Sequence, residues 1–304
     1  MSTVKTWLFG RADSPQTVQQ SIPYEQMYKD GICRVNSRFF TKTIGFQDIN
    51  YQLSQNEDKE QIFDNYCTFL NYFDSSISVQ FTFVNRRANT DEFAQSVEIP
   101  NKDDEFDDIR REYDGIIKSQ LARGNNGIVK TKYITFGVEV DNLKEAKARL
   151  ERVEADIISN FKVLGVSAKS LNGHERLEIL HAQLHPVNDS RAGEKFHFHW
   201  SDLPVSGLST KDYIAPSGFD FRDGRVFGMG DSVGAVSFLQ INAPELTDRL
   251  LADFLDLNTN ITVTLHIRSI DQAKAIKTVK RKLSDLDSMK INEVRPDRVL
   301  CEAV

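Results

Sequence analysis

The stretch IVKTKYITFGVEVDNLKEAKARLERVEADIISNF, residues 128–161, decides the fold because its hydrophobic period changes near residue 141. Up to residue 140, β-branched and aromatic residues alternate with other residues, which is typical of a strand. From residue 142 onward, apolar residues recur three or four positions apart, as on one face of a helix. These helical positions are Leu143, Ala146, Leu150, Val153, Ile157 and Phe161. Asn142 and Glu145 have the spacing of a capping pair, so the stretch predicts a strand followed by a helix that covers a sheet.

The same order of elements is predicted before and after this stretch. A first unit has a strand, a helix, a strand and an acidic helical stretch, expected at 41–50, 57–74, 78–84 and up to about Gln120. The helix of that unit has an apolar face formed by Ile62, Phe63, Tyr66, Phe69, Leu70 and Phe73. The second unit, which starts with the quoted stretch, continues with a short strand at 163–169 and a helix at 172–184.

A third unit is predicted near the end of the chain. Its four elements are a strand, a helix, a strand and a helix, expected at 234–241, 242–257, 260–268 and from 269 onward. Asn242 with Glu245 has the spacing of a helix cap, and so does Ser269 with Gln272. The last helix has an apolar stripe that includes Ile276, Leu283 and Leu286.

Three strand–helix–strand–helix units predict an α+β fold, in which ferredoxin-like antiparallel or mixed sheets are covered by helices. We expect an N-terminal arm, a first α+β subdomain, a second α+β subdomain and an atypical tail, at 1–30, 31–205, 206–292 and 293–304. The segment between the second and third units is rich in Gly, Pro and Ser. Within it, FDFRDGRVFG (219–228) predicts a hairpin that turns at Asp223-Gly224.

Composition restricts the function classes. The chain has 304 residues, of which 40% are hydrophobic and 27% are charged, and a net charge of −6. A negative net charge argues against general binding to nucleic acid, which requires many phosphates to be neutralised. Cys33, Cys67 and Cys301 are odd in number and widely spaced, which favours reduced thiols over disulfides or a zinc site. We find neither a signal peptide nor an apolar run of about 18 residues, so we expect membrane contact only through a partner and a cytoplasmic location.

Residues 123–132, RGNNGIVKTK, superficially resemble a phosphate-binding loop. In such a loop the lysine follows the second glycine directly, and a helix begins there to hold the phosphates. Here Lys130 follows Gly127 by three positions, and strand-type residues come next. We therefore predict a polar turn before a strand, and neither catalytic residues nor a bound nucleotide in this chain.

Histidines suggest a metal site, which the rest of the pattern argues against. His181 and His185 are one helical turn apart, and His197 and His199 follow on one side of a predicted strand. Together they could supply four zinc ligands. However, Pro186 ends the helix at His185, and neither a cysteine nor an H-E-x-x-H pattern lies nearby. We predict no metal site, with these four residues as the only candidates. The acidic run 103–108 is similarly interpreted as a solvated first helical turn rather than a cation site.

Two surfaces are predicted to bind partners. The N-terminal arm contains Ile22, Tyr24 and Met27, which we expect to be exposed; the alternative is a strap folded onto its own domain. The last helix is basic, with Lys277, Lys280 and Arg281 among its cations, and is either a solvated face or a docking surface for an acidic partner or lipid head groups.

Four stretches carry a resemblance to a known family. They are SIPYEQMYKDGICRV (21–35), FQDINYQLSQNEDKEQIFDNYCTFLNYFDSSI (46–77), GNNGIVKTKYITFGVEVDNLKEAKARLERVEADI (124–157) and LSTKDYIAPSGFDFRDGRVFGMGDSVGAVSFLQINAPELTDRLLADFL (208–255). Together they resemble the VirB-type (CagE/TrbE/VirB) traffic ATPases of type IV secretion and conjugation. The resemblance extends over about residues 15–292. Within the family, the chain most resembles the branch carried by conjugative transposons and plasmids of Gram-positive bacteria.

The resemblance implies a non-catalytic N-terminal domain. In this family, ATP and Mg²⁺ bind a separate C-terminal motor domain, which would lie beyond residue 304. The N-terminal domain contributes to assembly and docks on inner-membrane channel components and other ATPase subunits. The resemblance does not include MSTVKTWLFGRAD at the N-terminus or NEVRPDRVLCEAV at the C-terminus. A frameshift, a natural truncation or a cloning boundary would each explain such a C-terminal tail.

Two other functions are compatible with the sequence. A free-standing truncated paralogue could regulate secretion by competing for the partners of the full-length ATPase. An RRM-like sheet could bind nucleic acid through Tyr133 and Phe136. Those two residues are expected on opposite faces of their strand and the net charge is negative, so nucleic acid is disfavoured as a partner.

Overall fold

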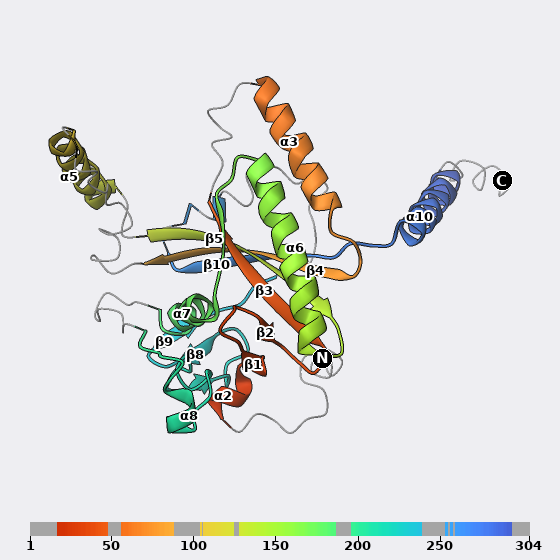
Figure 1. Ribbon diagram of the computed structural model, residues 1–304. Helices are drawn as coiled ribbons and strands as arrows, with labels where there is room; N and C mark the ends of the chain where they lie inside the picture. Colours follow the sequence, from red (N-terminus) through yellow and green to blue (C-terminus); the bar gives the residue numbers. More distant parts are fainter. Residues whose placement is uncertain are drawn as a thin grey trace, which may run out of the picture.

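A computed structural model describes residues 17–47, 56–87, 104, 106–124, 128–186, 196–238, 253–254, 256–257 and 259–293. Its centre is a seven-stranded sheet in the order β1-β2-β3-β5-β4-β10, with β6 also paired to β3 (Figure 1). Every neighbouring pair of strands is antiparallel. The strands are β1 (Gln26–Met27), β2 (Cys33–Arg34), β3 (Phe39–Phe46), β4 (Ile77–Arg87), β5 (Ile128–Glu139), β6 (Ala168–Ser170) and β10 (Ile261–Ile267).

The middle of this sheet has the ferredoxin-like topology that the sequence predicts. The chain order is β3, α3 (Asn56–Asn71), β4, β5, α6 (Leu143–Val163) and β6, while the order in the sheet is β6-β3-β5-β4. This is the split β-α-β arrangement. The prediction of an α+β fold is therefore confirmed. One more helix, α5 (Asp107–Gly124), is inserted between β4 and β5, and α7 (Gly173–Leu184) follows β6.

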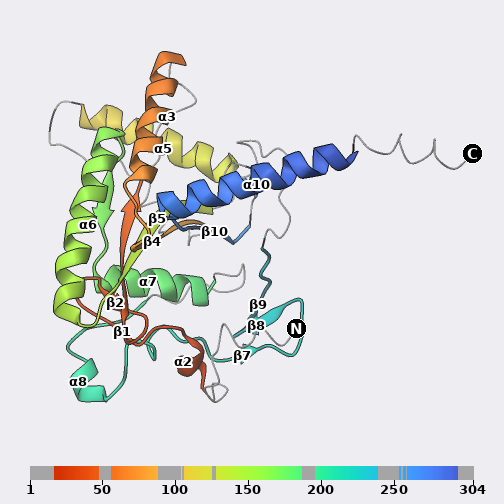
Figure 2. The same cartoon turned by 90° about the vertical axis from the view of Figure 1, so that its right-hand side faces the viewer.

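Helix α6 covers the sheet and forms the main hydrophobic core (Figure 2). The stripe predicted for residues 142–161 is the buried face, except that Leu143 is 37% exposed. Phe40 and Ile44 of β3 and Phe136 of β5 face this helix, as strand alternation requires. The Oδ1 atom of Asn142 accepts a hydrogen bond from the backbone N–H of Glu145 at 2.9 Å, so the predicted cap is confirmed.

A second, smaller core lies at the other face of the sheet. It contains residues of the N-terminal segment, of α7 and of the chain between 196 and 216. The N-terminal segment starts with α2 (Val18–Ser21), and the chain between 196 and 216 includes α8 (Leu203–Ser206). The turn before β2 requires glycine, since Gly31 has φ of +83° and a Cβ there would lie 2.1 Å from the carbonyl oxygen of Leu171. This close approach joins the N-terminal segment to the start of α7.

The hairpin predicted at 219–228 is confirmed. Strands β7 (Phe219–Asp220) and β8 (Phe227–Met229) pair through Phe219–Met229 and Asp220–Gly228, and β9 (Ser232–Gly234) completes a three-stranded sheet. In the turn, the Oδ1 atom of Asp223 accepts a hydrogen bond from the backbone N–H of Arg225 at 2.7 Å.

The third unit is the part of the fold that differs most from the prediction. The expected strand 234–241 is wrong for its described part, because Gly234 ends β9 and residues 235–238 are exposed and not in a strand. Most of the helix expected at 242–257 lies outside the described residues. Strand β10 is confirmed, but it pairs with β4 and so extends the central sheet. The sheet therefore crosses the predicted boundary at residue 206, and the boundary itself stays a prediction.

The last helix, α10 (Gln272–Glu293), is confirmed, although Ser269 is not its cap. The hydroxyl of Ser269 donates a hydrogen bond to the carbonyl oxygen of Phe73 at 2.5 Å, which fixes the end of β10 beside α3. Asp271 caps the helix instead, since its Oδ1 atom accepts a hydrogen bond from the backbone N–H of Lys274 at 3.2 Å. Within the described parts of the chain, the structure contains no helix with the length and apolar character needed to cross a membrane.

Candidate functional site

The N-terminal segment is not an exposed arm, and the expectation that its apolar side chains are free is wrong. Ile22, Tyr24 and Met27 are only 7%, 7% and 2% exposed. The physical reason is that β1 and β2 add this segment to the sheet edge, where it packs against α7 and residues 196–216. The alternative of a strap folded onto its own domain is confirmed. These three residues therefore hold the domain together and leave little surface for a partner.

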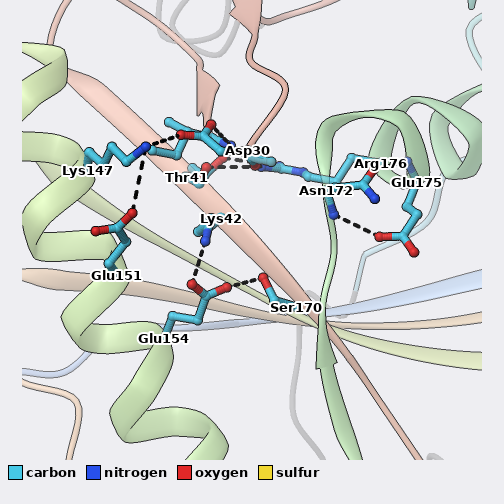
Figure 3. Close-up of polar contacts among 12 residues, drawn as sticks. Asp30, Thr41, Lys42, Lys147, Glu151, Glu154, Ser170, Asn172, Glu175 and Arg176 are labelled. Atoms are coloured by element: carbon cyan, nitrogen blue, oxygen red, sulfur yellow. Dashed lines mark hydrogen bonds and ion pairs between the residues drawn. The ribbon is translucent and has the colours of Figure 1, made fainter. Parts of the chain in front are cut away.

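A buried polar group joins the sheet to α6 (Figure 3). Lys42 alternates with Phe40 and Ile44 along β3, so its side chain points towards the core. Its Nζ atom donates a hydrogen bond to one carboxylate oxygen of Glu154 on α6, and the hydroxyl of Ser170 on β6 donates to the other. The side chains of Lys42 and Glu154 are only 8% and 13% exposed. This buried group connects three elements of the fold.

A second polar group fixes α7 to the other side of β3 (Figure 3). The guanidinium of Arg176 is enclosed and donates hydrogen bonds to the carbonyl oxygens of Gly31 and Thr41, at 2.7 and 3.0 Å, and to the Thr41 hydroxyl at 3.2 Å. Burial lowers the pKa of Arg176 and raises the pKa of the nearby Cys33 thiol. A thiol with a raised pKa is a poor nucleophile. The arrangement therefore supports a structural role for both residues.

The four candidate metal ligands are not brought together. The rings of His181 and His185 stack with their centroids 4.1 Å apart, and the Phe196 ring lies 5.2 Å from His181. His197 and His199 are exposed, whereas Phe196 before them and Phe198 between them pack towards α7. Among the residues with described positions, no three His, Cys, Asp or Glu side chains are placed to hold one metal ion. The histidines of α7 instead contribute to an aromatic cluster.

The other two ligand-like motifs also have structural explanations. Asp107 and Asp108 lie in the first turn of α5, as predicted. The guanidinium of Arg110 binds Asp104 at 2.6 Å and Asp107 at 2.5 Å, and this hydrogen bonding lowers the pKa of Asp104. Residues 125–127 of the loop-like turn lie outside the described residues. The chain after them is strand β5, as predicted, so no helix begins where a phosphate would bind.

The two aromatic residues considered for nucleic-acid stacking lie on opposite faces of the sheet, as expected. Phe136 is fully buried in the main core under α6. Tyr133 lies on the other face beside Gly45, and burial raises its pKa. A stacking platform needs aromatic rings exposed on one face, so these two residues do not form one.

The basic helix α10 is exposed along its described side chains, except that Ala275 is half-buried. Lys277, Lys280 and Arg281 are exposed to solvent, which is compatible with both a solvated face and a docking surface. Its apolar stripe is equally exposed: Ile276, Val279, Leu283 and Leu286 have exposed fractions of 49%, 56%, 56% and 56%. Figure 1 shows α10 projecting away from the central sheet. The predicted apolar face is present, but no described part of the chain covers it.

Two other helices also expose apolar side chains. Phe69 of α3 and Phe73 just after it are buried, but Phe63 and Tyr66 are 60% and 44% exposed, because the N-terminal end of the helix projects beyond the sheet (Figure 1). Along α5 the exposed apolar residues are Phe106, Ile109, Tyr113 and Ile116. Their helical spacing was readable in the sequence, whereas their exposure depends on where each helix lies relative to the sheet.

Comparisons with known proteins give no family. No model of a known protein family matches the chain, and no curated protein matches it significantly. The resemblance to traffic ATPases therefore stays a prediction. The exposed faces of α3, α5 and α10 are the candidate functional surfaces of this molecule.

Proposed function

We propose that this chain is a non-catalytic assembly and docking domain of a conjugative type IV secretion ATPase. It acts by protein–protein contact with channel components and ATPase subunits at the inner face of the membrane. The proposal assigns no ATP hydrolysis to these 304 residues, because the sequence contains no phosphate-binding loop. The proposal rests on the resemblance together with the exposed helix faces.

The observation that carries the proposal is the exposed stripe of α10. Four aliphatic side chains in a row, from Ile276 to Leu286, are about half exposed. Isolated apolar residues at a surface are ordinary, but a continuous apolar stripe on a projecting helix is unfavourable in water and is typical of a surface that binds another protein. The cations beside the stripe favour an acidic partner.

The proposal is tested by co-expressing the tagged chain with the membrane channel proteins and the full-length ATPase of a Gram-positive conjugation system. We expect the chain to retain at least one of them, and the variants Phe63→Ser/Tyr66→Ser and Ile276→Ser/Leu283→Ser to retain less. Val205→Ser is the matched control, since Val205 is an apolar residue that is 89% exposed and lies outside these helices. Retention of none of these proteins by the wild-type chain, or equal retention by all variants, would contradict the proposal.

A further inference from the structure

Helices α5 and α10 expose apolar stripes with the same spacing. On α10 the stripe is Ile276, Val279, Leu283 and Leu286, and on α5 it is Phe106, just before the helix, followed by Ile109, Tyr113 and Ile116. Both sets step by three, four and three residues, which is the repeat of a narrow helix–helix seam. An in-plane membrane helix has a wider apolar face with aromatic residues, and α10 has no aromatic residue. The stripe of α10 therefore fits another helix better than a lipid surface.

A second α10 is a poor partner for this stripe. Lys280, Arg281 and Lys282 lie at the middle of the stripe, which runs from 276 to 286. Lys280 and Lys282 flank the stripe, whereas Arg281 lies on the far face of the helix. In an antiparallel symmetric pair of α10 helices the flanking cations would lie near the same cations of the partner, whereas a parallel pair would place Lys282 beside Asp287 and leave Lys280 without an acid. Like charges on facing flanks of a coiled coil oppose association. An acidic partner helix complements both Lys280 and Lys282, whereas a second α10 complements at most Lys282.

Helix α5 has the required charge. From 272 to 283, α10 has five cations and no acid, whereas the described residues from Asp104 to Ile116 include five acids and two arginines. Both arginines already bind acids of their own segment, Arg110 with Asp104 and Asp107, and Arg111 with Asp108. By the same spacing, Arg110 and Glu112 flank the α5 stripe where Lys280 and Lys282 flank the α10 stripe, and Arg110 is already bound to two acids. Helix α3 fits less well, because the C-terminal half of its stripe is already buried in the core.

The two helices leave opposite ends of the same strand. Helix α5 leads into Ile128, which pairs with Arg87 at the end of β4, whereas α10 follows Ile267, which pairs with Val79 near its start. Eight residues of strand separate these positions by about 26 Å. Figure 1 accordingly shows α5 and α10 on opposite sides of the sheet. This placement favours pairing between two molecules over pairing within one.

We infer that the apolar stripe of α10 docks on α5 of a second copy of this chain, with the cations of α10 beside the acids of α5. Each copy offers both helices, so the contact is heterologous and either closes into a ring or continues to further copies. The inference rests on one part of the proposed function, which is that these helix faces are docking surfaces.

A charge exchange between two variants of the full-length chain tests this inference. The first variant, Lys280→Glu/Lys282→Glu, makes the α10 flanks acidic, and the second, Asp108→Lys/Glu112→Lys, makes α5 basic. All four residues are exposed, so circular dichroism should show that both variants keep the wild-type fold. Sedimentation velocity over a range of protein concentrations then measures the self-association of each variant and of their equimolar mixture.

We expect the wild-type chain to self-associate, each variant alone to associate at least about tenfold more weakly, and the mixture to recover most of the loss. Recovery is expected because the acidic α10 of the first variant meets the basic α5 of the second, while the two unchanged helices still match. A wild-type chain that is monomeric at every concentration, or a mixture that associates no better than its separate variants, would overturn the inference. The first result is also the one that pairing within a single chain would give.

Lipid binding is tested in the same series with vesicles of phosphatidylcholine and phosphatidylglycerol. Co-sedimentation of the wild-type chain that is lost in the Lys280→Glu/Lys282→Glu variant, without any self-association, would assign α10 to the membrane and overturn the inference. Failure of the proposed function is a different result. In that case no channel protein or full-length ATPase is retained, whether or not the chain associates with itself.

Discussion

Helices α6 and α10 have nearly the same length and pattern but opposite surroundings. They contain 21 and 22 residues, and each has an apolar stripe with three- and four-residue steps. From Ala146 to Phe161 the stripe of α6 is at most 7% exposed, whereas that of α10 is about half exposed. Helix α6 connects two strands of the sheet and must lie across it, whereas α10 follows the edge strand β10. Periodicity therefore identifies an apolar face, and the position of a helix in the topology decides whether its own chain covers that face.

The largest effect should come from the buried charge on the sheet under α6. Replacing Lys42 by Met leaves the carboxylate of Glu154 buried without its cation, and we expect a loss of about 4 kcal/mol in the free energy of unfolding. The matched change Lys280→Met on α10 should alter that free energy by less than about 0.5 kcal/mol, because Lys280 is exposed. Urea denaturation measures both.

The double variant Lys42→Met/Glu154→Gln serves as the control for this pair of changes. Since it removes both charges, it should recover a large part of the loss. Equal small losses of unfolding free energy for Lys42→Met and Lys280→Met would show that the buried carboxylate of Glu154 does not need the charge of Lys42.

A slightly smaller effect is expected from the apolar stripes themselves. Leu150 of α6 is fully buried, so Leu150→Ala should lower the free energy of unfolding by about 3 kcal/mol through lost burial and a cavity. Leu283→Ala on α10 should lower it by less than about 0.5 kcal/mol at concentrations where the chain is monomeric. A loss above 2 kcal/mol for Leu283→Ala would mean that α10 is packed in solution and would contradict the comparison.

The sequence predicts β5 and α6 well because each has one strong local signal, whereas the strand expected at 163–169 is only Ala168–Ser170. The alternation from Ile128 onward, the helical stripe after it and the Asn142 cap all agree, and the structure confirms each of them. The same kind of local signal explains the hairpin around Asp223. These features depend on residues that are close together in the sequence, so one sequence is enough to predict them.

Burial of the N-terminal segment could not be predicted in the same way. Ile22, Tyr24 and Met27 have no periodicity, and they are buried by α7 and by residues near Phe198, which are more than 100 positions away. The buried pair of Lys42 and Glu154 is also long-range. A lysine within a strand gives no local sign of whether a helix will supply a carboxylate. The candidate surfaces were similarly visible only as apolar or basic faces, and their exposure came from the topology.

Alkaline pH should weaken the small core around α7 more than α10. Burial raises the pKa of Tyr24 to about 12, and its hydroxyl lies 3.0 Å from the hydroxyl of Thr210. An unfolded tyrosine ionises near pH 10. Stability from the neutral Tyr24 is therefore fully present below about pH 10 and is lost between pH 10 and 12, with a total of about 2 kcal/mol.

The test compares urea denaturation of the wild-type chain and the Tyr24→Phe variant at pH 8 and pH 11. The variant should be less stable at pH 8, because it lacks the bond to Thr210, and should lose less stability on going to pH 11. Cys33 also has a pKa raised by burial, so part of the alkaline loss should remain in the variant. Identical pH dependence in the two proteins would contradict the assignment to Tyr24.

The smallest effects should come from the two N-caps. Asn142 accepts a hydrogen bond from Glu145 at the start of α6, and Asp271 accepts one from Lys274 at the start of α10. Asn142→Ala should lower the free energy of unfolding by about 1 kcal/mol, because α6 unfolds together with the core. Asp271→Ala removes the same kind of bond, yet it should change the global unfolding free energy by less than about 0.3 kcal/mol, since an exposed helix opens before the core does.

Hydrogen exchange separates these two cases. In the Asp271→Ala variant the amides of α10 should exchange faster while those of α6 keep their wild-type rates, whereas Asn142→Ala should accelerate exchange in α6 and in the strands it covers. At concentrations where α10 is docked on a second copy, the Asp271→Ala variant should also associate more weakly, because the docked helix must first be formed. A loss of core protection in Asp271→Ala at low concentration would mean that α10 is coupled to the sheet of its own chain. Its apolar stripe would then have an intramolecular partner, and α10 would differ from α6 only in how much of its stripe is buried.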